Sequence, residues 1–283
     1  MNPMIKYRGG KSKEIPSFSA YIPEEYDTYY EPFVGGGAVY FHLQPPKAVI
    51  GDVNENVINF YREIQTNYIE ARKQLDELQE IYESNRKEFE RLKALTPDEH
   101  IHDDNEDFYY RMRDIFNHKI PSKYLDSVVY YFINKTAYSG MIRYNAQGAY
   151  NVPYGRYKNF NTNLITNEHI ELLQRTEIVL GDYTQLFERS ISKDFMFLDP
   201  PYDCIFNDYG NLEMKNGFDE TEHRRLANNF KNLECKALMV IGKTPLIEEL
   251  YGEYIKAEYF KSYSVNIKNR FKSESNHVII TNY

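Results

Sequence analysis

The chain has 283 residues, 42% of them hydrophobic and 16% aromatic, no Trp, and a net charge of −8. This length suits one large domain or a domain with a sizeable insertion, and the hydrophobic fraction excludes an intrinsically disordered chain. Two cysteines, Cys204 and Cys235, are too few for a disulfide framework, and no Cys/His cluster has the spacing of a metal site. No apolar run reaches the roughly 18–20 residues that span a bilayer, and the N-terminus lacks the apolar core of a signal peptide. We therefore expect a cytoplasmic protein without a membrane partner and without a metal.

Positive charge is concentrated in two segments, residues 1–13 and 127–167, which each contain four Lys or Arg and no Asp or Glu. The second segment also contains seven tyrosines. Cations mixed with aromatic rings suit a nucleic-acid surface, where they neutralise phosphates and stack on bases. A tyrosine-rich loop with ordinary solvated charge is the alternative that composition alone leaves open.

Strand-like and helix-like segments alternate at both ends of the chain. Residues 28–43 predict a strand, a glycine turn and a helix, and residues 48–64 repeat this order. Further strands are predicted at 177–180, 195–198, 237–241 and 277–282, and helices at 221–233 and 245–250. Such alternation is typical of a parallel α/β sheet.

The middle of the chain has a different pattern. Residues 68–95 are charged and amphipathic, which predicts a surface helix, since the charge alternation lasts too few heptads for a coiled coil. The acidic stretch 96–108 predicts a loop, and residues 125–140 predict a buried helix. Residues 143–158 predict a hairpin with its turn at Gln147-Gly148.

A glycine-rich segment, EPFVGGG at residues 31–37, directly follows the first predicted strand. Glycines at this position let the backbone approach a ligand at the carboxyl end of a sheet, and Asp52, at the end of the next strand, is where a carboxylate can hold ribose hydroxyls. The segment is neither a P-loop nor a full GxGxxG. Together the two features predict a nucleoside-bearing cofactor, and a plain glycine turn with a solvated Asp is the alternative.

The tetrapeptide Asp199-Pro200-Pro201-Tyr202 at a predicted strand end is a more specific signal. Its prolines fix an extended backbone without donors, so it presents a carboxylate, the Pro200 carbonyl and an aromatic face. An amino group on an aromatic ring is a poor nucleophile because its lone pair is delocalised into the ring. Two acceptors that hold its N–H groups favour the nucleophilic geometry, while Tyr202 stacks on the ring.

Taken in chain order, KYRGGK, EPFVGGGAVYF, DVNENVINFY, the GDY turn and DPPY resemble the Dam-type adenine-N6 DNA methyltransferases of the alpha (D12) class. The segment TAYSGMIRYNAQGAYNVPYGRYKN resembles their DNA-reading hairpin, and the resemblance covers the whole chain except the charged 70–120 region. It implies a Rossmann-like α/β methyltransferase domain at 1–60 and 161–283. An inserted, mostly helical target-recognition domain at 61–160 would carry the β-hairpin 143–158.

The resemblance also implies the chemistry. S-adenosylmethionine would be the methyl donor, S-adenosylhomocysteine the product, and a flipped-out adenine in duplex DNA the acceptor. Family members with this hairpin often methylate GATC, so GATC or a GAT-containing site is expected. A cognate restriction endonuclease acting on the same site is a candidate partner, in a nucleoid-associated enzyme of bacterial or phage origin.

Site residues follow from the same resemblance. The catalytic residues are Asp199, Pro200 and Tyr202. Cofactor contacts are expected at Tyr7, Lys11, Glu31, Pro32, Phe33, Gly35, Gly37, Asp52, Asp182, Tyr183 and Asp199. DNA contacts are expected at Lys6, Tyr138, Ser139, Met141, Arg143, Asn145, Pro153, Arg156, Tyr157 and Lys158. Arg143 aligns with an arginine that reads guanine in the major groove, and Tyr138 with an aromatic that stacks into the duplex.

Two other functions stay open at this point. One is a methyltransferase for RNA or for a protein amide, although such families usually carry Asn in place of Asp199 and lack the hairpin. The other is a catalytically idle DNA-binding regulator that retains the fold, against which the intact motifs argue.

Overall fold

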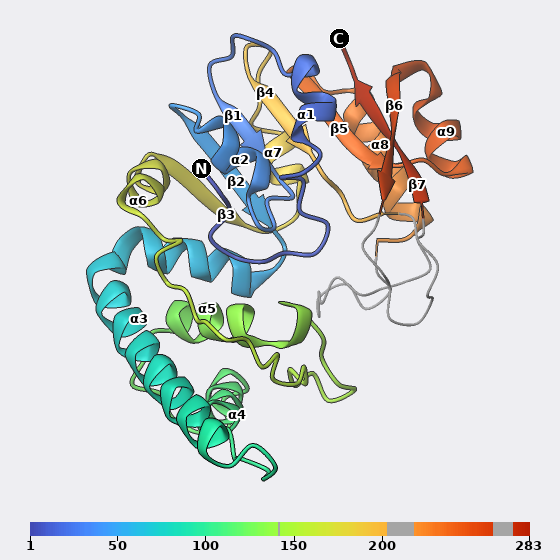
Figure 1. The fold of residues 1–283 in the computed structure, drawn as a ribbon. Coiled ribbons are helices and arrows are strands. Elements are labelled where there is room, and N and C mark those ends of the chain that lie inside the picture. Colours follow the sequence, from blue (N-terminus) through green and yellow to red (C-terminus); the bar gives the residue numbers. More distant parts are fainter. Residues whose placement is uncertain (141, 203–217, 263–273) are drawn as a thin grey trace. The chain divides into compact units, whose positions relative to one another are not determined.

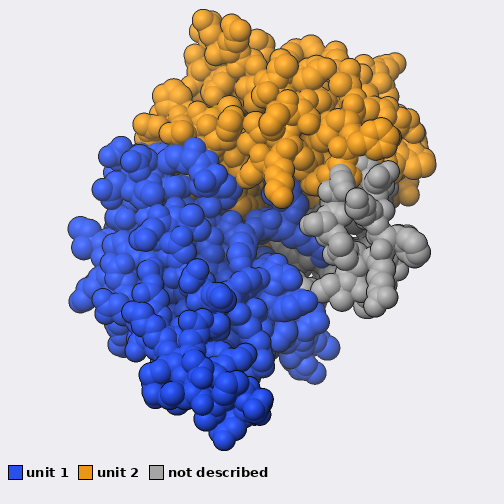
Figure 2. Space-filling view, in the orientation of Figure 1, with its two compact units in different colours: residues 1–10, 55–174, 208–210 blue, residues 11–54, 175–207, 211–283 orange. Residues whose placement is uncertain are grey.

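The computed structural model describes residues 1–140, 142–202, 218–262 and 274–283. Within these ranges the chain forms two compact units, which Figure 2 shows in different colours. Unit 1 contains residues 1–10 and 55–174, so the predicted insertion at 61–160 falls inside it; the remaining described residues belong to unit 2. None of the described helices combines the length and the apolar character needed to cross a membrane.

Unit 2 is built on a seven-stranded sheet with the order β3-β2-β1-β4-β5-β7-β6. The strands are β1 (Tyr29–Glu31), β2 (Ala48–Asp52), β3 (Thr176–Leu180), β4 (Phe195–Leu198), β5 (Lys236–Gly242), β6 (Ile255–Ser262) and β7 (Glu274–Thr281). Strands β1 to β5 pair in parallel, and β7 is antiparallel to both of its neighbours. This confirms the predicted α/β class. The strand order reverses between β1 and β4, which is where open α/β sheets bind ligands.

Helices of unit 2 cover both faces of this sheet (Figure 1). They are α1 (Ile15–Phe18), η1 (Ser19–Tyr21), α2 (Ala38–Leu43), α7 (Thr184–Phe187), α8 (Glu220–Lys231), α9 (Pro245–Tyr251) and η3 (Gly252–Tyr254). Met196 and Leu198 of β4 pack in one core with Leu226 and Phe230 of α8. Phe197 points to the opposite face, where its ring stacks on Phe18 of α1 with centroids 5.4 Å apart. Strands buried on both faces need continuous apolar runs, which is what β4 and β5 have.

Unit 1 is helical. Its elements are α3 (Glu55–Leu95), α4 (Asp104–Phe116), α5 (Asp126–Thr136), η2 (Tyr138–Gly140) and α6 (Asn167–Gln174). Helix α3 joins into one the helix expected at the end of residues 48–64 and the helix expected at 68–95, with a kink between them at Asn67 (φ −123°, ψ 29°). Helix α5 is buried along most of its length and packs against α3 and α4.

The loop predicted at 96–108 is wrong in its second half, because α4 begins at Asp104. The Asp103 side chain accepts a hydrogen bond from the backbone N–H of Asn105 at 3.1 Å and caps the helix. Acidic residues in a first turn interact favourably with the helix dipole, so the acidic run promotes a helix start here. Helix α6 and strand β6 were also not predicted.

Tyr82 of α3 provides a test of how unit 1 is held together. Its buried hydroxyl donates to the Tyr157 carbonyl at 2.5 Å and lies 2.6 Å from the Tyr154 hydroxyl. Tyr82→Phe leaves these buried partners unsatisfied, so we expect the free energy of unfolding in urea to fall by roughly 1–3 kcal/mol. The control is Tyr251→Phe: that hydroxyl is also buried but has no hydrogen-bond partner among the described residues, so its loss is expected to be near neutral. Equal effects of the two substitutions would contradict this account.

Candidate functional site

Four carboxyl groups gather where parallel strands of unit 2 end. Glu31 and Asp52 are the last residues of β1 and β2, Asp199 directly follows β4, and Asp182 lies two residues after β3. The carboxyl ends of parallel strands meet at one edge of a sheet. The structure therefore brings together four acids that the sequence assigned to the site from separate motifs.

Asp199 forms an ion pair with Lys11. The Lys11 Nζ donates to the Asp199 Oδ1 at 2.5 Å; the lysine side chain is 2% exposed and the aspartate side chain 21%. Burial raises the pKa of Asp199, and the Lys11 charge opposes that rise. The Lys11 Nζ also lies 5.1 Å from the centroid of the Tyr202 ring. The lysine of the N-terminal motif thus contacts the first and last residues of the DPPY tetrapeptide.

Asp52 fastens the glycine turn to β2. Its two carboxylate oxygens accept hydrogen bonds from the backbone N–H groups of Gly35 and Asn54, each at 2.9 Å. Burial raises the pKa of Asp52 to about 6, although these backbone donors favour the charged form. Gly35 (φ +46°) and Gly37 (φ +68°) adopt the left-handed conformation that glycine accommodates without strain. The turn therefore has a fixed shape, with backbone close to the sheet edge.

Glu31 is almost fully buried, at 2% exposed. Its Oε2 accepts a hydrogen bond from the Tyr29 hydroxyl at 2.6 Å. Burial raises the pKa of Glu31 to about 8, and the nearby Asp199 charge acts in the same direction. Glu31 is therefore mostly protonated at neutral pH and can donate a hydrogen bond.

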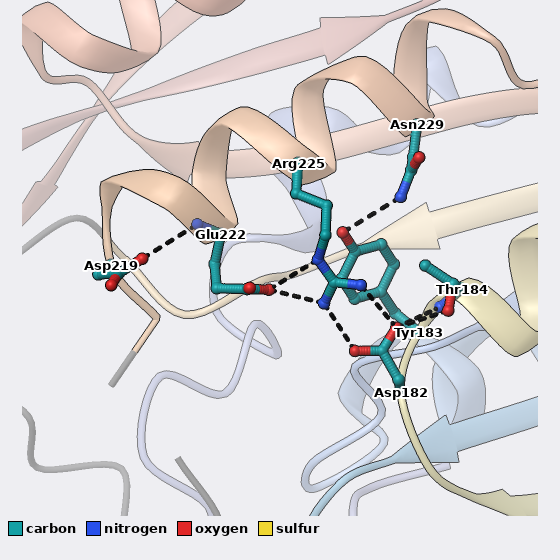
Figure 3. A network of polar contacts seen from close by, with 7 residues as sticks. All are labelled: Asp182, Tyr183, Thr184, Asp219, Glu222, Arg225 and Asn229. Atoms are coloured by element: carbon teal, nitrogen blue, oxygen red, sulfur yellow. Dashed lines mark hydrogen bonds and ion pairs between the residues drawn. The ribbon is translucent and has the colours of Figure 1, made fainter. Parts of the chain in front are cut away.

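Asp182 lies in a network that the sequence did not reveal (Figure 3). Arg225 of α8 donates to both of its carboxylate oxygens, with Nη2 2.7 Å from Oδ2. The Arg225 guanidinium also pairs with Glu222 and lies 4.7 Å from the centroid of the Tyr183 ring. Burial would raise the pKa of Asp182, but hydrogen bonds from Arg225 and Thr184 outweigh it and the pKa is lowered. Only the i,i+3 spacing of Glu222 and Arg225 was readable in sequence, and it gives no hint of Asp182.

Aromatic rings line the same part of the sheet edge. The Phe33 ring lies 5.3 Å from Tyr183 and 6.2 Å from Phe218, between centroids. Pro32 is buried beside Phe33, and Pro200 is buried beside Asp199. Flat apolar surfaces next to an orientable carboxylate and a glycine turn are able to hold a purine ring and its ribose. Tyr7, the remaining predicted cofactor contact, belongs to unit 1 and is half-buried.

The predicted DNA contacts belong to unit 1, and several of them touch. The Lys6 Nζ donates to the Lys135 carbonyl at 3.1 Å and lies 4.2 Å from the centroid of the Tyr157 ring. The backbone N–H of Tyr138 donates to the Pro153 carbonyl at 2.9 Å, while the Tyr138 side chain is exposed. Burial lowers the pKa of Lys6 and lowers that of Lys135 to about 8. These contacts form a basic, aromatic surface.

The chain reverses at the predicted turn but forms no regular strands there. Tyr144 and Tyr150 form an isolated antiparallel bridge, and Gly148 has φ +78°. The Asn145 side chain accepts hydrogen bonds from the turn's own backbone. The backbone N–H groups of Asn145 and Asn151 donate across the turn to the carbonyls of Ala149 and Arg143, at 2.8 Å and 3.0 Å. Asn117, which follows α4, hydrogen-bonds both backbone groups of Tyr150, so the predicted turn is a short hairpin held partly by a side chain.

Arg143 is exposed near this turn. Its Nε donates to the Asn151 Oδ1 at 2.8 Å and its Nη2 to the Asn151 carbonyl at 3.2 Å. Arg156, also exposed, pairs with Glu106 at 3.0 Å. The exposed residues Ser139 and Lys158 complete the described set. Met141 lies outside the described residues.

Comparisons with known proteins agree with these motifs. The model of the D12 class N6 adenine-specific DNA methyltransferase family matches residues 7–269. The chain belongs to this family. It is 37% identical to the Type II methyltransferase M.CviBI of Paramecium bursaria Chlorella virus NC1A over 291 residues, covering 100% of both chains. It is 29% identical to the Type II methyltransferase M1.LlaDCHI of Lactococcus lactis subsp. cremoris over 301 residues, covering 100% of this chain and 96% of that one.

A DNA adenine methylase from Haemophilus influenzae is 25% identical over 288 residues, covering 95% of this chain and 90% of that one. The D12 enzyme is therefore a DNA adenine methyltransferase with the Rossmann-like sheet of its family. Neither the idle regulator nor a methyltransferase for RNA or protein amides is supported.

Glu31 gives the D12 enzyme a testable pH dependence. Its pKa of about 8 in the folded state exceeds the ordinary value of 4.5. Between these two pH values the unfolded state releases the proton that the folded state keeps, so stability is full below about pH 4.5 and is lost as pH rises to about 8. Glu31→Gln removes this loss. In thermal unfolding from pH 5 to pH 9, we expect the Tm of the variant minus that of the wild type to rise and then level off. A difference independent of pH would show that Glu31 is charged when folded.

Proposed function

We propose that the enzyme transfers a methyl group from S-adenosylmethionine to N6 of a flipped-out adenine in duplex DNA, at GATC or a GAT-containing site. Two of the relatives are named Type II methyltransferases, which supports a cognate restriction endonuclease as a partner. The observation that carries the proposal is the DPPY tetrapeptide at the end of β4, with Asp199 held by the buried Lys11 and placed beside the point where the strand order reverses.

The residues around the glycine turn fit the methyl donor. S-adenosylmethionine would supply an electrophilic methyl group on a sulfonium. The half-buried Phe33 offers a flat surface for its adenine, and the buried ring of Tyr183 packs behind Phe33. Asp182 is an oriented acceptor for a purine amino group. A carboxylate has about four acceptor sites, so Asp52 can accept from ribose hydroxyls in addition to its backbone donors.

The target adenine would be held by the tetrapeptide itself. A base inside the duplex is out of reach and has to be flipped out, at a cost of a few kcal/mol. Its N6 donates to the Asp199 carboxylate and to the Pro200 carbonyl, and its ring stacks on Tyr202. Lys11 orients the carboxylate before the base arrives. The enzyme's contribution is thus positioning and a matched electrostatic site.

We assign recognition of the DNA base sequence to the exposed basic residues of unit 1. Arg143 presents a guanidinium fork of the kind that pairs with guanine in the major groove. Tyr138 is the exposed ring that can stack into a duplex, and Arg156 and Lys158 suit phosphates. Lys6, beside Tyr157, is proposed to contact a guanine.

The proposed reaction is tested with labelled S-adenosylmethionine and plasmid DNA, followed by single-molecule mapping of N6-methyladenine. Wild-type enzyme should methylate adenine at GATC. Methylation at another motif would contradict the base contacts assigned to the hairpin, and DNA without label would contradict the proposed donor or the proposed substrate.

The substitution Asp199→Asn should lower kcat about 100-fold or more, since an oriented charge is lost from the site. The matched control is Asp194→Asn, at another buried carboxylate, whose hydrogen bonds among the described residues come from the backbone N–H groups of Thr28 and Ile191. This variant should keep the wild-type kcat. Near-wild-type turnover of Asp199→Asn would contradict the mechanism.

Arg143 and Arg156 form a second comparison. Arg143→Ala should reduce the binding free energy by roughly 1–3 kcal/mol at one base pair and relax specificity there. Arg156→Ala should weaken binding to all sequences equally and make the affinity less dependent on salt concentration. Binding to GATC duplexes and to single-substitution duplexes, measured at several salt concentrations, separates the two. A uniform loss for Arg143→Ala would make it a phosphate contact instead.

A further inference from the structure

Glu14, three residues after Lys11, is a buried carboxylate that no motif contains. It is 5% exposed and precedes the first residue of α1. Its Oε2 accepts from the Tyr259 hydroxyl at 2.8 Å and lies 2.7 Å from the His277 Nδ1, and its Oε1 accepts from the Lys261 Nζ. Burial would raise the pKa of Glu14, but His277, Lys11, Lys261 and Tyr259 outweigh it and lower the pKa to about 2.

The partners of Glu14 come from the antiparallel end of the sheet. His277 of β7 lies opposite Gly242 of β5 and opposite Tyr259 of β6. Directly opposed residues of neighbouring strands share a face, and Tyr259 and Lys261, two residues apart, point to the same side of β6. Glu14 therefore binds three side chains on one face of the sheet at a single point.

Tyr202 packs against His277, one of the three side chains that Glu14 binds. Its ring meets the His277 ring edge-on, with centroids 5.1 Å apart and an interplanar angle of 83°. The same ring lies over Gly242, where an added methyl group would be 3.5 Å from the Tyr202 Cδ2, an ordinary van der Waals contact. Lys11 is near the same ring. The position of the ring thus depends on His277, and that of His277 on Glu14.

The same residue also fixes Lys11. The backbone N–H groups of Glu14 and Ile15 both donate to the Lys11 carbonyl, at 2.7 Å and 3.1 Å. The turn that carries Lys11 to Asp199 is therefore tied to the sheet through the Glu14 side chain.

We propose that Glu14 is a positioning residue for methyl transfer: by anchoring His277, Tyr259 and Lys261 it fixes the ring of Tyr202 and the ion pair between Lys11 and Asp199. This inference rests on the proposed function, in which the target adenine stacks on Tyr202 and bonds to Asp199. Glu14 touches neither substrate, so its effect is on the geometry of the reacting complex rather than on binding.

The test compares Glu14→Gln with Asp194→Asn, since both exchange a buried carboxylate for an amide and only the first contacts the Tyr202 support. Glu14→Gln should lower the single-turnover rate of methyl transfer about tenfold or more at saturating DNA and donor, with the Kd for DNA almost unchanged. Asp194→Asn should lose stability without this loss of rate. Tyr259→Phe, which removes one hydrogen bond to Glu14, should give a smaller loss in the same direction.

A duplex with 2-aminopurine at the target position adds a second readout. Stacking on Tyr202 quenches this base, so its emission in the Glu14→Gln complex should exceed that of the wild-type complex. Equal rates and emission for Glu14→Gln and wild type, or an equal rate loss in Asp194→Asn, would overturn the inference while the proposed function stands. If the wild-type enzyme transferred no methyl group to any DNA, both the proposed function and the inference about Glu14 would be contradicted.

Discussion

Parallel strands end at one edge of a sheet, and this constraint organises unit 2. Glu31, Asp52, Asp182 and Asp199 come from four different motifs and meet because β1, β2, β3 and β4 run in the same direction. Four carboxylates at one edge would repel one another and would be costly to desolvate. The contacts of the other site residues reduce this repulsion and offset the cost of desolvation.

Each carboxyl group is stabilised differently, and the difference suits its use. Asp199 is paired with Lys11, Asp182 with Arg225, Asp52 accepts backbone N–H groups, and Glu31 keeps its proton. Asp199 and Asp182 are each oriented by a cationic side chain and can accept further hydrogen bonds. Asp52 holds the glycine turn in shape. Burial raises the pKa of Glu31 to about 8, so it adds little negative charge next to Asp199 at neutral pH, which limits repulsion at the position where an amino group would be held.

Much of this was readable in the sequence, and the exceptions have physical reasons. Strands β1 to β5 and β7 were predictable because apolar runs, glycines and prolines act locally, and Asp52 and Asp199 because they end such strands. Glu31 and Asp182 were assigned to the site from the family resemblance. Helix α4 was missed because an acidic run reads as solvated loop until the capping role of Asp103 is known. Arg225, Glu14 and His277 were missed because their partners lie 43 or more residues away and follow from the register of strands. The hairpin was predicted from its turn, and backbone hydrogen bonds do cross that turn, but the support that Asn117 gives to Tyr150 from a distant segment is encoded by no local pattern.

The sequence separations of these contacts have a consequence for biosynthesis. The clasp between Gly35 and Asp52 closes over 17 residues, whereas Lys11 reaches Asp199 over 188 and Glu14 reaches Tyr259 over 245. Short loops close first, and contacts between distant parts of the chain wait for the loop-closure entropy to be overcome. On the ribosome the glycine turn can therefore form early, but the N-terminal segment keeps its charged groups in water until β6 and β7 have emerged. A partly synthesised chain can therefore close the glycine turn on Asp52, whereas the ion pair of Lys11 with Asp199 and the bond of Glu14 with Tyr259 form only after those much later residues have emerged.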